Sequence, residues 1–118
     1  MKHSLLICAA LLLVACEEQR PIRSSALTPQ SRGHALAHAS CAACHAIELN
    51  STSSPNPQAP PFPAIVNQEG LTAETLSSWL TDAHNYPDEM DFKLDTRKVD
   101  DLVAYMLTLS DPDYRPQG

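Results

Sequence analysis

The sequence predicts an all-α fold of three to four short helices joined by long loops. Three segments carry helical capping signals or helical spacing of apolar residues, and no segment alternates convincingly as a strand. The connection from Asn50 to Pro63 is rich in Ser, Asn and Pro, which excludes the interior of a helix or sheet. Only 5% of the residues are aromatic, so three short helices would bury little surface by themselves. We therefore expect a bound group to fill part of the core.

Each of the three predicted helices begins at a cap. Thr28 followed by Pro29 predicts the start of a helix that runs to about residue 39. Thr72 predicts the N-cap of a second helix, and Asp95 that of a third, which ends before Asp111 and its following proline. The apolar face of the second helix is Leu76, Trp79 and Leu80, and that of the third is Val99, Leu102, Val103, Met106 and Leu107.

The N-terminal residues predict an export signal that is not part of the fold. Lys2 is followed by an apolar run of 11 residues that ends at Ala15, too short to span a bilayer as a helix. Leu13-Val14-Ala15-Cys16 resembles the lipobox of bacterial lipoproteins, in which the cysteine is acylated and becomes the first mature residue. We expect lipidated Cys16 to anchor a bacterial, periplasmic or otherwise extracytoplasmic protein. The alternative is an ordinary signal peptide that contains a cysteine.

The predicted organisation is a signal peptide (1–15), a lipid-anchored flexible tether (16–27), one folded domain (28–111) and a tail (112–118). Loss of Lys2 with the signal takes the net charge from −6 to −7. An acidic chain argues against binding to nucleic acid or anionic lipid surfaces. It is compatible with a basic docking patch on a redox partner, and equally with a solvated surface that only maintains solubility.

The strongest chemical signal is the motif Cys41-Ala42-Ala43-Cys44-His45, the attachment sequence for haem c. Cys8 leaves with the signal peptide and Cys16 takes lipid, so no disulfide framework remains to be built. The two-residue spacing lets both thiols add to the vinyl groups of neighbouring pyrroles, and His45 then lies under the iron as the proximal ligand. The sequence therefore predicts one covalent haem c as the cofactor.

Three other interpretations of the motif are weaker. A thioredoxin-like redox pair would need a preceding strand and a βαβ pattern. A structural zinc site needs four ligands, which His34, His38 or His84 would have to complete. A chance occurrence would leave the export signal unexplained. Zinc is the best of these alternatives.

From Gly33 to Leu109 the chain resembles a class I monohaem cytochrome c. Gly33 lies eight residues before the first motif cysteine, where that family has a small residue that lets the C-terminal helix cross closely. Asp101-Leu102-Val103-Ala104-Tyr105-Met106 resembles the family's C-terminal helix signature. Ala59-Pro60-Pro61-Phe62 resembles the loop whose proline carbonyl accepts a hydrogen bond from the proximal imidazole. Pro60 fits this role best, with the next proline close behind.

The resemblance implies a methionine as the sixth iron ligand, on a loop before the last helix. Met1 is cleaved off and Met106 occupies a core position, so Met90 remains; His84 is the rival. The acidic residues around this methionine, Asp88, Glu89 and Asp91, depart from the usual loop.

The other histidines and the apolar residues near the motif complete the predicted site. His34 and His38 precede the motif on its own helix and are expected to be surface histidines. Residues expected to wall the cofactor pocket are Phe62, Ile65, Trp79, Leu80, Phe92 and Leu94. The Trp79 indole is a possible donor to a haem propionate.

Two protein ligands would leave the iron no open position, which implies single-electron transfer and no catalysis on a small-molecule substrate. Expected partners are a dehydrogenase, a respiratory complex or a terminal oxidase or reductase, and the chain could also be the haem subunit of a larger oxidoreductase. Two alternatives stay open. If Met90 dissociates, the domain is a gas or redox sensor or a weak peroxidase; if haem is absent, the chain is a zinc-binding lipoprotein.

Overall fold

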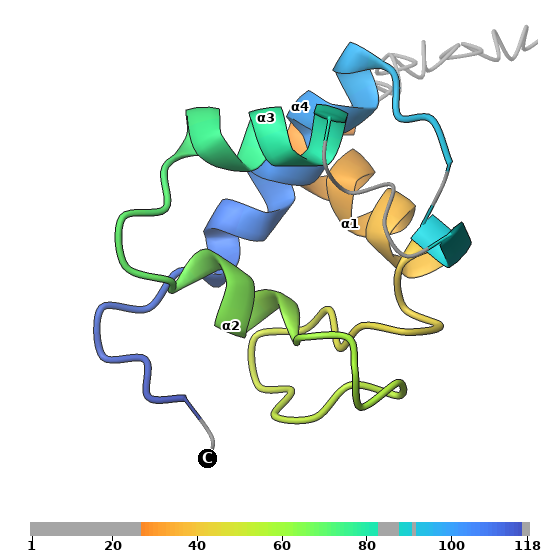
Figure 1. Cartoon of the computed structure of the whole chain (residues 1–118). Helices are drawn as coiled ribbons and strands as arrows, with labels where there is room; N and C mark the ends of the chain where they lie inside the picture. The colour runs from red at the N-terminus through yellow and green to blue at the C-terminus, as the bar shows by residue number, and fades with distance from the viewer. Residues whose placement is uncertain (1–26, 83–87, 91, 117–118) are drawn as a thin grey trace, which may run out of the picture.

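The computed structural model describes residues 27–82, 88–90 and 92–116, and the part of the chain so described is helical, without strands. The elements are α1 (Pro29–Ser40), α2 (Phe62–Val66), α3 (Ala73–Asp82), the 3₁₀ turn η1 (Asp88–Met90), α4 (Thr96–Met106) and the 3₁₀ turn η2 (Leu107–Leu109). Figure 1 shows α1 crossing α4, with α2 lying apart from this crossing. The all-α prediction is confirmed. The signal peptide, Cys16, His84 and Asp91 lie outside the described residues.

The three predicted caps are present and explain where the helices begin. Thr28 Oγ1 accepts a hydrogen bond from the Ser31 N–H at 3.1 Å, and Asp95 accepts one from the Lys98 N–H at 3.0 Å. Thr72 Oγ1 accepts from the Thr75 N–H at 3.2 Å at the start of α3. These short polar side chains satisfy N–H groups that have no acceptor within their own helix.

The crossing of α1 and α4 depends on a glycine. Gly33 is buried, and a Cβ built on it would overlap the backbone carbonyl oxygen of Asp101 and lie 2.7 Å from the Tyr105 Cβ. No larger residue could occupy this position without moving one helix away from the other. The predicted reason for a small residue eight positions before the motif is confirmed.

Polar contacts flank this crossing, one between the two helices and two from the helices to the chain that follows the motif. The Arg32 guanidinium donates two hydrogen bonds to the Asp101 carboxylate, at 2.5 and 2.7 Å, and these bonds lower the pKa of that carboxyl. The Tyr105 hydroxyl donates to the Ile47 carbonyl at 2.8 Å. His34 Nε2 lies 2.8 Å from Glu48 Oε1.

The description of His34 as a surface histidine was therefore incomplete. Its ring also lies against that of Tyr105, with centroids 4.9 Å apart, because the flank of α1 faces the last helix at the crossing. His38 is exposed, as expected.

The long loop ends earlier than the sequence predicted. The interpretation of residues 50–63 as non-helical throughout was wrong at its end, because Phe62 and Pro63 form the first turn of α2. A proline fits the first turn of a helix, where its missing N–H would have had no partner. The helix of five residues is too short to give a periodic signal.

The core lies where α4 meets the other helices. Leu76 on α3 and Leu102 and Met106 on α4 are each 1% exposed. Phe62, Ile65 and Val66 from α2 join the same cluster, as do Leu80 and Leu109. In the described residues no helix is long and apolar enough to cross a membrane.

Candidate functional site

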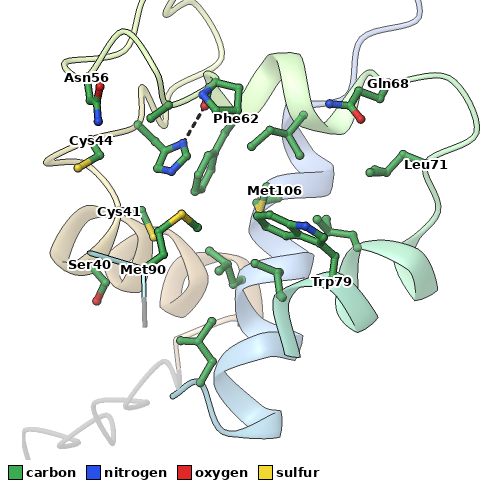
Figure 2. Close-up of a pocket in the computed structure, with 18 of the residues that line it drawn as sticks. Ser40, Cys41, Cys44, Asn56, Phe62, Gln68, Leu71, Trp79, Met90 and Met106 are labelled. Carbon is green, nitrogen blue, oxygen red and sulfur yellow. Dashed lines mark hydrogen bonds between the residues drawn. The ribbon is translucent and has the colours of Figure 1, made fainter. Parts of the chain in front are cut away.

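The motif cysteines and histidine directly continue the last turn of α1. The Cys41 N–H donates to the Ala37 carbonyl at 2.8 Å, and the His45 N–H donates to the Cys41 carbonyl at the same distance. This turn brings both cysteines and the histidine to one cavity. Figure 2 shows Cys41 and Cys44 on the same side of it. The site is therefore anchored to the helix that crosses α4 at Gly33.

The cavity has a volume of about 740 Å³. This lies within the range of roughly 300–1,000 Å³ that is usual for pockets holding small molecules and cofactors. All six residues predicted to wall the pocket line it: Phe62, Ile65, Trp79, Leu80, Phe92 and Leu94. Trp79 remains 40% exposed, so the cavity reaches solvent on this side, and Figure 2 shows Trp79 across the cavity from the cysteines.

His45 is oriented by a hydrogen bond on one of its two ring nitrogens. Nδ1 lies 2.8 Å from the Pro60 carbonyl oxygen, the bond drawn as a dashed line in Figure 2. A carbonyl can only accept, so Nδ1 carries the proton and, in the neutral ring, Nε2 keeps a lone pair. The ring also packs against Phe62, with centroids 5.5 Å apart. The side chain is buried and held in the tautomer that a metal ligand requires.

Met90 lines the same cavity as His45. It is the last residue of η1, is half-buried, and Figure 2 shows it beside Cys41. Asp88, two residues earlier in the same turn, is exposed. The rival ligand His84 lies outside the described residues. Met106 lines the cavity too, but it is 1% exposed and belongs to the core face of α4, as the sequence predicted.

The two motif thiols are not arranged as a thioredoxin-like redox pair. Burial, with a smaller contribution from the neighbouring Cys44, raises the pKa of the Cys41 thiol to about 11. A catalytic redox cysteine needs the opposite shift, because the thiolate is its reactive form. The site also follows a helix and not a strand.

The residues the structure describes contain no group of three or more His, Cys, Asp or Glu side chains that could hold a metal ion. His34 and His38 therefore do not complete a zinc site with the motif cysteines. A zinc site of Cys₂His₂ or Cys₃His type needs all four ligands within bonding distance. The donor set at the cavity, two thiols, one imidazole and the thioethers of Met90 and Met106 among apolar walls, suits a haem better.

Sequence reasoning missed the hydrogen bonds that close the loop after the motif. Ser54 Oγ accepts from the Ala46 N–H at 3.0 Å, and the Phe62 N–H donates to the Ala46 carbonyl at 2.8 Å. Ser54 stands in a run of four hydroxyl residues, Ser51 to Ser54, and no sequence pattern distinguishes it from the other three. Leu71 and Gln68 also line the cavity from the turn between α2 and α3.

A comparison with models of known protein families matches residues 30–110 to the family described as Cytochrome c. A search of curated proteins gives no match. A search of solved structures gives none either.

Proposed function

The chain belongs to the cytochrome c family, and we propose that it is a membrane-anchored, single-electron carrier of the periplasm with His45 and Met90 as iron ligands. Members of this family bind haem c covalently through cysteines and carry electrons, and Cys41 and Cys44 stand in the attachment motif of this chain. The observation that carries the proposal is one apolar cavity lined by both cysteines, His45 and Met90.

The residues at the cavity have distinct roles in this proposal. When bound, haem supplies an iron that alternates between the ferric and ferrous states and so holds one electron at a time. Cys41 and Cys44 would hold it as thioethers, and His45 would offer Nε2 to the metal because Pro60 occupies its other ring nitrogen. The Met90 thioether would be the second protein ligand and would favour the ferrous state.

The walls of the cavity act on the same equilibrium. Apolar side chains such as Phe62, Ile65 and Leu80 line the site and lower its local dielectric constant. A low local dielectric disfavours the more highly charged ferric state, so burial raises the reduction potential in the same direction as a thioether ligand. With two protein ligands the iron has no position for a substrate, which suits a carrier and not an enzyme. The expected partners are a dehydrogenase, a respiratory complex or a terminal oxidase or reductase.

A haem stain of a denaturing gel tests the cofactor. Thioether-linked haem survives denaturation, whereas a bound metal ion does not, so full-length protein co-expressed with cytochrome c maturation machinery should stain. Protein that never stains would contradict the proposal.

Optical spectra test the Met90 ligand. The ferric protein should show the weak far-red band of an iron–thioether bond, and Met90→Ala should lose it. Met106→Leu is the matched control, because it removes the other sulfur that lines the cavity from a buried core position. A band that survives Met90→Ala would assign the ligand elsewhere, with His84 as the next candidate.

Cell fractionation tests the anchor. Several acyl chains at about 0.8 kcal/mol per buried methylene would hold Cys16 firmly at a membrane. Wild-type protein should sediment with membranes, and Cys16→Ser should release it. Wild-type protein found only in the soluble periplasmic fraction would exclude the lipid anchor and leave the electron carrier intact.

A further inference from the structure

The loop between His45 and Pro60 has few contacts that could hold it in place. No helix or strand forms between residues 46 and 61. From residue 50 to residue 61 no side chain is buried, and only Ser51, Ser54, Ala59 and Pro61 are half-buried. Hydrophobic packing is therefore weak within residues 50–61, and the nearest buried side chain is that of Phe62, two residues after Pro60, whose carbonyl orients His45.

Hydrogen bonds close this loop onto the motif at three points besides the one to His45. The Asn56 N–H donates to the Cys44 carbonyl at 3.1 Å, and the Phe62 N–H donates to the Ala46 carbonyl at 2.8 Å. The third runs from the Ala46 N–H to Ser54 Oγ at 3.0 Å. Among these three closures only the last uses a side chain, so it is the one that a substitution can remove without altering the backbone.

We infer that Ser54 is a positioning residue for the axial imidazole of His45, an inference that rests on the haem-binding function proposed above. Its hydroxyl accepts from the residue that directly follows His45 and ties the middle of the loop to the motif. This link restricts the loop that carries Pro60, so the carbonyl stays at hydrogen-bonding distance from Nδ1.

The consequence for the cofactor follows from the hydrogen bond on the imidazole. An Nδ1–H that donates to a carbonyl makes the ring a stronger electron donor through Nε2. Loss of the Ser54 hydroxyl lets the loop move and weakens the average bond between His45 and Pro60. A poorer donor stabilises the ferric state less, so the reduction potential rises.

The test compares Ser54→Ala with Ser53→Ala in the full-length, haem-loaded protein. Ser53 is the exposed neighbour, for which the described residues offer no hydrogen-bond partner. The reduction potential should rise in Ser54→Ala, stay at the wild-type value in Ser53→Ala, and return to it in Ser54→Thr, which restores a hydroxyl. Hydrogen exchange of the Ala46 amide should accelerate in Ser54→Ala alone.

Each result decides the inference. A Ser54→Ala protein with the wild-type potential overturns it, even if that variant is less stable, because a purely structural residue would lower stability without moving the potential. The wild-type protein gives a second criterion that requires no variant to fold. Its Ala46 amide must exchange more slowly than those of Thr52 and Ser53, and equal rates would overturn the inference. Failure of the haem stain in wild-type protein would instead reject the proposed function, which separates the two conclusions.

Discussion

At the crossing of α1 and α4 the backbones of the two helices are in direct contact. Around the cavity, in contrast, α2, α3 and the loop after the motif enclose a volume of about 740 Å³. The contacts at the crossing are all made between groups of the protein. Gly33 admits the Asp101 carbonyl, and Arg32 and Tyr105 add polar contacts on its flanks. The cavity is instead lined by largely apolar side chains together with the motif residues.

This difference indicates which half of the domain depends on its cofactor. Protein interiors are close-packed, and apolar side chains that line a cavity contact one another less than those of a packed core. Leu102 and Met106 line the cavity and also belong to the core of α4, so the two regions share residues. We therefore expect the residues around the cavity to need bound haem in order to fold. Any structure that remains without haem should lie at the crossing.

The largest effect should come from removing the covalent attachment. Cys41→Ala/Cys44→Ala protein should be largely unfolded and should show no cooperative thermal transition by circular dichroism, because the haem would supply the missing core. Ser40→Ala is the control at the same edge of the cavity and should melt like wild-type protein. A cooperative melt of the double-cysteine variant would show that the polypeptide folds without attached haem.

A substitution at the crossing should be next in size. Gly33→Ala forces a Cβ into the Asp101 carbonyl and should lower the free energy of unfolding by about 3 kcal/mol or more, in the upper range for overpacked sites. Gly70→Ala is the matched control. Its φ of 78° disfavours a side chain by about 1–2 kcal/mol, but the added Cβ meets open space. Equal losses in denaturant titrations would contradict the close approach of the helices.

Much of the crossing could be predicted from the sequence because its causes are local. The caps of its two helices, at Thr28 and Asp95, and the spacing of apolar residues on the last helix each act within a few residues. Gly33 predicts a close helix crossing only when it is considered together with the C-terminal helix that it contacts. The short helix α2 was missed, because five residues give no period and two prolines suggest a loop.

The cavity was less predictable, because its geometry depends on contacts between distant residues. The motif indicated Cys41, Cys44 and His45 directly. The hydrogen bond from His45 to Pro60 joins residues 15 positions apart and was expected only from the family resemblance. The role of Ser54 had no sequence signal, since a hydroxyl in a polar loop is usually exposed and only the fold shows which one turns inward.

A smaller effect is expected where the crossing contacts the chain that follows the motif. Tyr105→Phe removes the hydrogen bond to the Ile47 carbonyl and should lower the free energy of unfolding by about 1 kcal/mol at neutral pH. Tyr114→Phe, in the C-terminal segment, should change it by less than about 0.5 kcal/mol.

The Tyr105 hydroxyl also predicts how the stability of the protein depends on pH. Burial, with help from Glu48, raises the pKa of Tyr105 to about 12 from its ordinary value of 10.0. Its contribution to stability is therefore complete below pH 10 and is lost as the pH rises toward 12. The wild-type protein should lose stability over this interval more steeply than Tyr105→Phe, and parallel curves would contradict the burial of the hydroxyl.

The smallest effect should appear only in acid, at the ion pair on the other flank of the crossing. Hydrogen bonds from Arg32 lower the pKa of Asp101 below its ordinary value of 3.8. A carboxyl with a lowered pKa stabilises the fold above its ordinary value, and this stability is lost as the pH falls through the lowered one. Asp101→Asn should therefore flatten the dependence of the unfolding free energy on pH below about 4.

Asp100→Asn provides the control for loss of one negative charge from the same turn of α4, since Asp100 is exposed and Arg32 pairs with Asp101. It should keep the wild-type steepness in acid. The guanidinium is about one-third exposed, so added salt should reduce the advantage of wild-type protein over Asp101→Asn. If Asp100→Asn flattens the curve as much as Asp101→Asn does, general charge repulsion and not this pair governs the acid response. The ion pair on this flank of the crossing would then contribute no more to acid stability than charges on any solvated surface.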